Sequence, residues 1–436
     1  MHGSLTASAP SREAPTTEYP VHRAEFLLLI GVLLIFSEGI LPRLLSGDET
    51  ADGSAMLRYL WLPIYAVIFA GTVWKIREVA QTCLRLPFLM GLLAVCAVSF
   101  AWSIDPAITQ RRSLAILMTT AAGLYIGSRY SWRTLLRGLA ITWFVIAATS
   151  FLTALALPVY GRDFETHGGA WKGLFFEKNQ LGAHMARAAL FGAFLLIMDR
   201  PYRVWWAGLT GLSVLLVFLS TSKTSLLGLL IGLGILSIAA VMKRGMVFGL
   251  VTAWFGIILS AVFVGILVST PELIVSVLGR DLTLTGRTDI WITLVDFISE
   301  RPLLGYGYGA FWDDGSNSGN WVREMVEWDA PTAHNGWFEV TLALGLIGLA
   351  LLALDFLMTI WRASWSSINT WAGVFALAFC AQFFLFNLSE SASLQQNSIV
   401  WLIYVALAAK LARRPIGRIF IKPAQLRPPV TRMAQA

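Results

Sequence analysis

Apolar runs of about 20 residues recur along most of this chain, and they restrict its fold more than any other feature. The first begins near residue 25 and the last ends near residue 413. A helix of about 20 residues crosses the hydrocarbon core of a bilayer, whereas the strands of a membrane barrel are about 10 residues long and alternate in polarity. Runs such as Val247 to Val268 are almost continuously apolar. The sequence therefore predicts an all-α polytopic membrane protein.

The composition supports this fold class and excludes others. Of the 436 residues, 56% are hydrophobic and only 14% are charged, so a soluble domain could not cover its surface with polar groups. The net charge of +7 is expected to set the membrane topology, not to bind nucleic acid. Cys83, Cys96 and Cys380 lie in or beside apolar runs without the paired spacing of metal ligands. No disulfide framework, metal site or cofactor is expected.

Hydropathy predicts about 12 transmembrane helices, with a large loop between helices 9 and 10. The expected spans lie near residues 25–42, 57–74, 87–103, 113–128, 135–157, 181–198, 203–220, 224–242, 247–268, 336–360, 370–388 and 397–412. An even number of spans places both termini on one side of the membrane.

Five segments follow from these spans. Residues 1–24 are rich in Ser, Thr, Ala and Pro, which indicates a disordered cytoplasmic tail and not a cleaved signal. We expect residues 25–268 to form helices 1–9, residues 269–335 the large loop, residues 336–412 helices 10–12, and residues 413–436 a basic cytoplasmic tail.

Basic residues indicate which face is cytoplasmic. Short connections on one side carry most of the cations, and short cationic connections are typical of the cytoplasmic side. The opposite side carries the large loop and most of the carboxylates. The cations are Lys75, Arg77, Arg85, Arg129, Arg133, Arg137, Arg200, Arg203, Lys243, Arg244 and those of the tail from Lys410 to Arg432.

The large loop is expected to be folded and to carry the chemistry. Loops longer than about 15 residues are usually functional or disordered, and the many aromatic residues here argue against disorder. The stretch from Thr288 to Ile298 has apolar residues at helical spacing, which predicts a helix at the membrane surface. Its acidic residues match no metal-binding loop pattern. The loop tryptophans are Trp291, Trp312, Trp321 and Trp328.

His334 is the candidate general base, because a neutral imidazole accepts a proton near neutral pH. It lies just before the apolar run that opens at Trp337. Asn335 and Glu339 are four residues apart on one helix face, and could orient the imidazole or bind a sugar. The alternative is a histidine that only caps the helix.

Several cations on the same side could form a basic site. Arg287 could present a fixed guanidinium fork to a phosphate, and Lys223 occupies a turn at membrane depth, where an unpaired cation is costly. The alternative is a set of interfacial cations near lipid headgroups. Trp291 could stack on a sugar ring or anchor the loop in the interface. Other candidates for this site are Lys178, Asn179, Arg162 and the intramembrane Arg187.

These residues lie in a set of motifs that resembles the O-antigen ligase and polysaccharide polymerase superfamily, most closely the exopolysaccharide polymerase branch. The resemblance covers roughly residues 85–400. The matching fragments are Ala101-Trp102-Ser103-Ile104-Asp105-Pro106, Phe176-Glu177-Lys178-Asn179-Gln180-Leu181-Gly182, Ser220-Thr221-Ser222-Lys223-Thr224-Ser225, Thr285-Gly286-Arg287 with Trp291, Pro302-Leu303-Leu304-Gly305-Tyr306-Gly307 and Ala333-His334-Asn335.

The resemblance implies a metal-independent, inverting glycosyltransferase of the bacterial inner membrane, whose large loop is periplasmic. The implied donor is an undecaprenyl-diphosphate-linked glycan in membrane lipid, and a flippase and a chain-length regulator are the expected protein partners. His334 would act as general base or orient the acceptor, Arg287 and Lys223 would hold the diphosphate, and Lys178 with Asn179 would help to define the site. A ligase that transfers finished glycan to lipid A core or protein is the first alternative, and a glycan transporter is the second.

Overall fold

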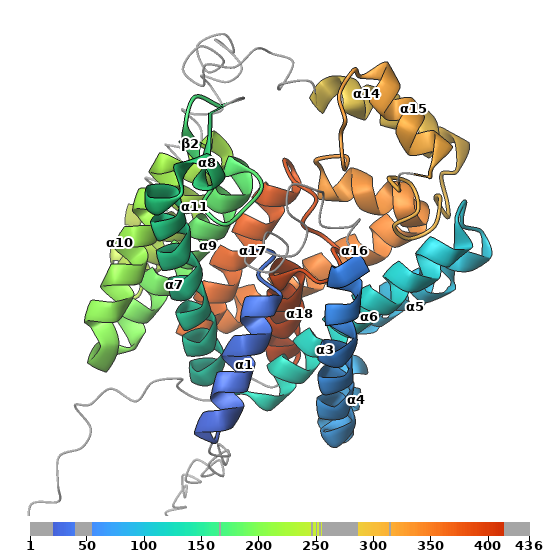
Figure 1. Cartoon of the computed structure of the whole chain (residues 1–436). Coiled ribbons are helices and arrows are strands. Elements are labelled where there is room, and N and C mark those ends of the chain that lie inside the picture. Colours follow the sequence, from blue (N-terminus) through green and yellow to red (C-terminus); the bar gives the residue numbers. More distant parts are fainter. Residues whose placement is uncertain are drawn as a thin grey trace, which may run out of the picture.

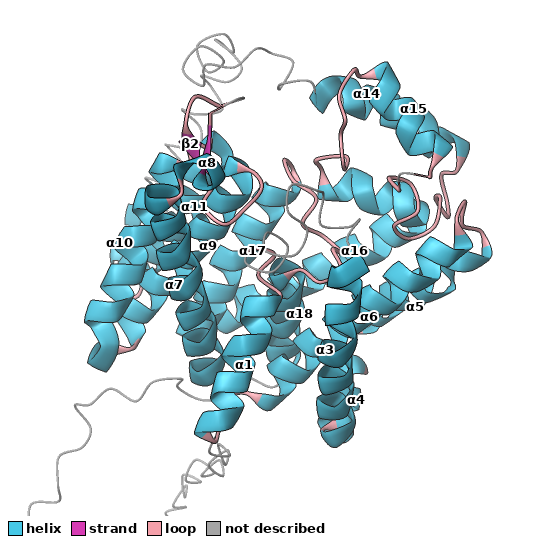
Figure 2. Cartoon of the chain, in the orientation of Figure 1, coloured by secondary structure: helices cyan, strands magenta, loops and turns pink. Residues whose placement is uncertain are grey.

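The computed structural model describes residues 21–39, 55–164, 167–245, 247–249, 251–252, 254, 287–313 and 315–413, and most of these residues are helical (Figures 1 and 2). The helices are α1 (Arg23–Ile35), α3 (Ala55–Trp74), α4 (Ile76–Cys83), α5 (Pro87–Val98), α6 (Pro106–Arg129), α7 (Trp132–Ala156), α8 (Pro158–Gly161), α9 (Lys178–Met198), α10 (Arg203–Leu219), α11 (Lys223–Met242), α14 (Arg287–Glu300), α15 (Asn317–Met325), α16 (Gly336–Asn369), α17 (Trp371–Asn387) and α18 (Ile399–Ala412). Two 3-10 turns, η1 (Ser99–Ala101) and η2 (Arg200–Tyr202), and two strands, β1 (Arg162–Asp163) and β2 (Ala170–Trp171), complete the described elements.

The apolar helices lie close to the expected spans and confirm a multi-pass membrane protein. Among the described residues, five helices are long and apolar enough to cross a membrane, namely α7, α9, α11, α16 and α10 with its preceding turn. The pair α3 and α4, bent by 87°, makes six if it is taken as one span, while α5, α17 and α18 are apolar but shorter. The number of 12 stays a prediction. Most of the expected span 247–268, loop residues 269–286, most of the first tail and nearly all of the second lie outside the described residues.

Helix α4 and the two strands are among the small elements that were not expected from the sequence. Helix α4 is amphipathic and turns away from α3, so hydropathy did not reveal it. Strands β1 and β2 pair Arg162 with Trp171 and Asp163 with Ala170, so the described part of the chain is all-α except for one minimal hairpin. Two residues are too few to show an alternating pattern.

Helix α9 lies at the centre of the helices that surround it. Most of its side chains are buried, and it contacts α7, α10, α11 and α17. Gly182 allows close approach, because a Cβ there would lie 2.5 Å from the Ser225 Oγ of α11. The Gln382 amide of α17 donates hydrogen bonds to the carbonyl groups of Ala186 in α9 (3.1 Å) and Gly228 in α11 (2.9 Å). One buried polar side chain thus joins three helices.

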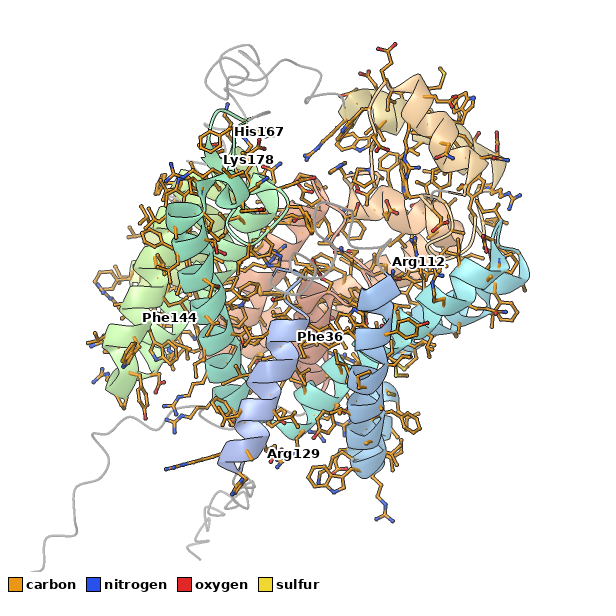
Figure 3. The ribbon with its side chains drawn as sticks, viewed as in Figure 1. Phe36, Arg112, Arg129, Phe144, His167 and Lys178 are labelled. Atoms are coloured by element: carbon orange, nitrogen blue, oxygen red, sulfur yellow. The ribbon has the colours of Figure 1, made fainter. Side chains whose placement is uncertain are left out.

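Predicted cytoplasmic cations gather at one end of the helices, here called the basic end. Arg129 pairs with Glu25 at 2.9 Å, and Arg137 binds the buried Asp199 through two hydrogen bonds of 2.6 and 2.7 Å. Lys243 donates to the Ser367 carbonyl at 3.0 Å. The opposite end, here called the loop end, carries α14 and α15, and Figure 3 shows Arg129 and Lys178 at opposite ends. That the basic end faces the cytoplasm stays a prediction.

A break in α16 joins the loop to the membrane helices. Gly345 adopts a left-handed φ of 64° inside α16. The backbone N–H and carbonyl groups on both sides of Gly345 therefore lose their usual hydrogen-bond partners within the helix. Residues 302–309, here called the glycine segment, supply new ones. The Tyr306 and Gly307 N–H groups donate to the carbonyl groups of Leu342 and Ala343 (2.8 and 3.0 Å). On the other side of the break, Leu346 N–H donates to the carbonyl group of Pro302 (2.7 Å) and Ile347 N–H to that of Leu303 (3.3 Å).

The described part of the large loop has a hydrophobic core of its own, as its aromatic content predicted. Helix α14 covers the stretch expected to be helical and packs with α15 over the glycine segment, while its place at the membrane surface stays a prediction. Trp312 is inside this core, whereas Trp321 and Trp328 are 45% and 38% exposed. The buried members are Ile290, Leu294, Tyr306, Phe311, Trp312, Val322, Ala330, Ala333 and Leu342.

Two of the motif fragments interlock at the glycine segment. The Trp102 indole donates to the Leu304 carbonyl (2.9 Å), and the Ile104 N–H donates to the Tyr306 carbonyl (3.0 Å). The Tyr308 hydroxyl donates to the carbonyl of Leu394, in the connection from α17 to α18 (2.7 Å). Gly307 has a φ of 97°, and a Cβ there would lie 2.3 Å from the Ser103 hydroxyl. The glycine segment is thus bound to two connections of the helical core, the one between α5 and α6 and the one between α17 and α18.

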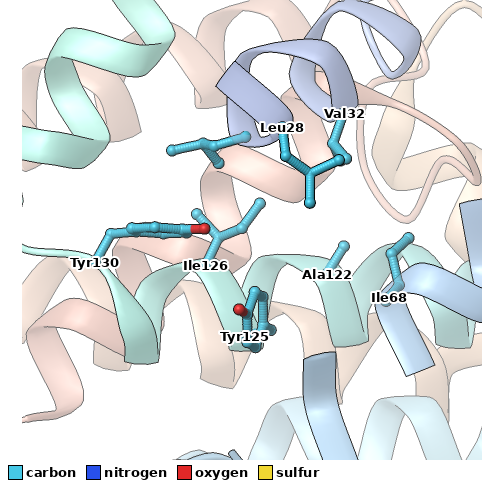
Figure 4. Close-up of a pocket in the computed structure, with 8 residues that line it drawn as sticks. Leu28, Val32, Ile68, Ala122, Tyr125, Ile126 and Tyr130 are labelled. Atoms are coloured by element: carbon cyan, nitrogen blue, oxygen red, sulfur yellow. The ribbon is translucent and has the colours of Figure 1, made fainter. Parts of the chain in front are cut away.

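An apolar cavity of about 40 Å³ lies between α1, α3 and α6, away from the large loop (Figure 4). Tyr130, one of its lining residues, follows directly after Arg129 of the basic end. The cavity holds no cluster of polar groups that would suit a sugar or a phosphate. Its lining residues are Leu28, Leu29, Val32, Ile68, Ala122, Tyr125, Ile126 and Tyr130.

Gly345→Ala should destabilise the junction between α16 and the glycine segment. A Cβ at this position would lie 2.1 Å from the Leu303 carbonyl carbon, and the left-handed backbone costs a non-glycine residue about 1–2 kcal/mol. We expect a lower unfolding temperature in detergent and faster proteolysis of residues 301–335. Gly234→Ala is the matched control, because nothing lies within 4 Å of its added Cβ and α11 is regular there. Equal stability of the two variants would contradict this account of the break.

Candidate functional site

His334 lies at the loop end, in the turn between α15 and α16, where sequence analysis placed the candidate base. Its backbone has a left-handed φ of 47°, and its side chain is buried. The imidazole stacks on Trp328, with ring centroids 5.1 Å apart and planes at 17°. Neither ring nitrogen has a hydrogen-bond partner among the residues that the structure describes. A non-glycine residue held in this backbone conformation indicates that the surrounding contacts fix its position.

Three predicted substrate-binding residues make internal bonds that hold the His334 turn. The Asn335 side chain caps α16 by accepting hydrogen bonds from the N–H groups of Trp337 (2.9 Å) and Phe338 (3.3 Å). Glu339 accepts from the Ala333 N–H (3.0 Å) and the Trp312 indole (3.1 Å). The Trp291 indole donates to the Ala333 carbonyl at 2.9 Å. The sugar-binding role of Asn335, Glu339 and Trp291 stays a prediction, and their observed contacts are with the backbone on either side of His334.

Arg287 and His334 are brought together by a residue that sequence analysis missed. Glu390 lies in the turn after α17, and its Oε1 accepts from the Arg287 Nη2 at 3.2 Å. Its Oε2 lies 3.5 Å from the His334 Nδ1. The isolated carboxylate matched no motif, because it lies in a short Ser-rich connection between two apolar runs. The sequence feature that could have revealed Glu390 is the predicted position of this carboxylate on the same side of the membrane as the large loop.

Glu177, directly before α9, belongs to the same electrostatic cluster. Although part of its side chain is exposed, the surrounding protein displaces water and raises the pKa of the Glu177 carboxyl. The neighbouring Glu390 carboxylate raises this pKa further, whereas interactions with His334 and Arg287 lower it. The start of α9 therefore lies near the two predicted catalytic residues.

Lys178 and Lys223 begin two neighbouring helices at the loop end. Lys178 Nζ contacts the Thr221 hydroxyl at 3.4 Å, just before α11 begins at Lys223. Lys223 is exposed, and Asn179 is half-buried at the second position of α9. Within the described residues, no hydrogen bond or ion pair joins Lys223 to His334 or Arg287. The structure thus places both lysines on the predicted face, and their binding of a diphosphate stays a prediction.

Arg162 and Arg187 differ in their surroundings. Arg162 donates from Nε to the Ala154 carbonyl at 3.0 Å and stacks over Trp171 at 5.0 Å, so it fastens the β1–β2 hairpin. Arg187 is buried in α9, lies over the Phe386 ring at 4.5 Å, and interacts electrostatically with Glu390. Its membership of the site stays a prediction.

The arrangement suits proton transfer beside a negatively charged group. A buried imidazole with a free nitrogen can accept a proton, and guanidinium groups in a partly desolvated setting bind oxyanions strongly. No group of three or more His, Cys, Asp or Glu side chains in the described part of the chain lies close enough to hold a metal ion.

Two comparisons with known proteins bear on the family of this chain. The sequence pattern of the O-antigen ligase family matches residues 208–353, a range that contains Lys223, Arg287 and His334 but not Glu390. The chain is also similar to the exopolysaccharide production protein ExoQ of Rhizobium meliloti (strain 1021), with 26% identity over 308 residues that cover 68% of this chain and 67% of that protein. The resemblance of this chain to the O-antigen ligase and polysaccharide polymerase superfamily, predicted from its motifs, is confirmed.

Proposed function

We propose that this protein is a membrane-embedded glycosyltransferase that polymerises oligosaccharide repeats carried on undecaprenyl diphosphate, in exopolysaccharide or O-antigen biosynthesis. The similarity to ExoQ and to the O-antigen ligase family supports an activity of the polymerase or ligase type. The observation that carries the proposal is the convergence of His334 and Arg287 on the Glu390 carboxylate at the loop end. We place this end at the periplasmic face of the inner membrane, with both termini in the cytoplasm.

The proposed reaction is a single inverting displacement. A hydroxyl oxygen of the acceptor sugar attacks the anomeric carbon of the donor, the new C–O bond forms, and the bond from that carbon to the diphosphate oxygen breaks. His334 accepts the hydroxyl proton at Nε2, and the lipid diphosphate leaves with the bonding electrons. A general base in this position contributes about 10²–10⁴-fold to the rate.

Cations of the protein would stabilise the leaving diphosphate without a metal ion. Arg287 has five N–H donors, and Glu390 accepts only one hydrogen bond from them in the described contacts. Lys178 and Lys223 begin α9 and α11, where the N–H groups of a helix end add partial positive charge. We propose that this face receives the diphosphate while the lipid tail stays in the bilayer, and that a flippase and a chain-length regulator act with the protein.

Transfer of a finished glycan to lipid A core or protein is the second candidate. The family pattern that matches residues 208–353 carries the description O-antigen ligase. The polymerase and the ligase differ in the acceptor, and the same His334 and Arg287 chemistry serves both. A glycan transporter is disfavoured, because transporters tend to place ionisable groups at the bilayer midplane, whereas this cluster lies at helix ends.

His334→Ala should slow polymer formation by about 10²–10⁴-fold by removing the proton acceptor, which leaves a residual rate that can be measured in vitro. We expect a deletion strain complemented with this variant to lose high-molecular-weight glycan and to accumulate single lipid-linked repeats. Long lipid-linked polymer that is not attached to an acceptor would instead identify a ligase. His22→Ala, the same change at the exposed start of α1, is the control and should restore normal glycan. Normal glycan with His334→Ala would exclude a catalytic role for this histidine.

Arg287→Ala should reduce kcat/KM for the lipid-linked donor by about 10²–10³-fold, the usual effect of losing one donor to a developing oxyanion. Initial rates with purified protein and a lipid-diphosphate oligosaccharide would measure this. Arg287→Lys keeps the charge but not the planar fork, and should recover only part of the loss. Arg111→Ala removes an exposed arginine of α6 and should leave the rate unchanged. Wild-type kinetics for Arg287→Ala would remove this residue from the site.

A further inference from the structure

Glu390 connects three segments that are far apart in the sequence. It lies after α17 and contacts Arg287 at the start of α14 and His334 in the turn before α16. The backbone of the Glu390 turn is fixed, because the Glu390 N–H donates to the Phe386 carbonyl at 2.7 Å. Its carboxylate therefore has one defined place between the two predicted catalytic side chains.

Burial makes this bridge energetically important. The side chains of His334 and Arg287 are 7% and 11% exposed, and that of Glu390 is 24% exposed. Charges interact more strongly where water is displaced, and removal of one partner leaves the others without compensation. The charged or titratable groups that face Glu390 are Arg287 from α14, His334 before α16, Glu177 before α9 and Arg187 from α9.

The geometry at His334 assigns different tasks to the two ring nitrogens. Nδ1 faces Glu390, and one ring face is covered by Trp328. A carboxylate beside Nδ1 favours the tautomer that carries its proton there, which leaves the Nε2 lone pair as the acceptor. At 3.5 Å the Nδ1 contact is longer than a hydrogen bond, and contacts of this kind often tighten when substrate binds.

We infer that Glu390 is a positioning residue, which holds His334 with Nδ1 protonated and Nε2 free. The inference rests on the proposed function and extends it to a residue outside the matched family range. Glu390 takes no proton in the reaction, because the hydroxyl proton goes to Nε2. Its effect on catalysis is exerted through His334.

Steady-state kinetics of Glu390 variants in lipid nanodiscs, with a lipid-diphosphate oligosaccharide as substrate, would test this role. Glu390→Gln should lower kcat by about 100-fold, the lower limit of a general base contribution, while KM stays within about twofold. Glu390→Asp keeps the charge on a shorter side chain and should lie between Gln and wild type. Glu324→Gln, an exposed glutamate of α15, is the control and should change neither constant.

A double-mutant cycle with His334→Ala separates positioning from an independent effect. If Glu390 acts through His334, then Glu390→Gln should cause no further loss in the His334→Ala protein. The same loss in both backgrounds, or wild-type kcat in Glu390→Gln, would overturn the inference. If the Gln variant does not fold, Glu390→Asp decides the question, because wild-type kcat there contradicts positioning and a lower kcat at unchanged KM supports it. Full activity of His334→Ala would instead refute the proposed base itself.

Discussion

The hydrogen bonds across the break in α16 are the contacts on which the rest of the loop end depends. Gly345 interrupts the helix, and the glycine segment restores the backbone pairing on both sides of the interruption. Unpaired backbone groups are costly at membrane depth, so irregular structure is tolerated there only when protein covers it. The loop is therefore joined firmly to the helical core, and its hydrophobic core shares Leu342 with α16.

This junction explains why reactive side chains from distant segments can meet. Helix α14 rests against α16, which places Arg287 near the turn that carries His334. The Tyr308 hydroxyl binds the Leu394 carbonyl and so ties the glycine segment to the connection that contains Glu390. Arg287, His334 and Glu390 each lie at a helix end or in a turn. The site is thus held by the ends of rigid elements and not by a free loop.

Much of the fold could be predicted from hydropathy, since an apolar run of about 20 residues has few alternatives to a helix. The boundaries of α9, α11 and α16 agree closely with the expected spans at their starts. The amphipathic α4 was missed because its charges hide it from a hydropathy average. The break at Gly345 was missed because a single glycine in an apolar run gives no distinct signal.

Site residues could be predicted where the residue type itself points to a chemical role. They could not be predicted where only their position in three dimensions indicates that role. His334 was recognisable as an isolated histidine at a helix start, and the structure buries it beside Arg287 and Glu390. The internal bonds of Asn335 and Glu339 could not be foreseen, because capping and substrate binding require the same polar groups. Glu390 can be recognised only from the structure, which places it between the candidates Arg287 and His334.

The junction at Gly345 also has an evolutionary consequence. It consists of backbone hydrogen bonds, which almost any residue can make, and the Leu303 and Leu304 side chains beside it are 60% and 41% exposed. Substitutions at such positions can accumulate while the glycines and the carbonyl pairing stay in place. Relatives that differ in the glycans they handle could therefore share one architecture, with the variation concentrated in side chains that the scaffold does not need.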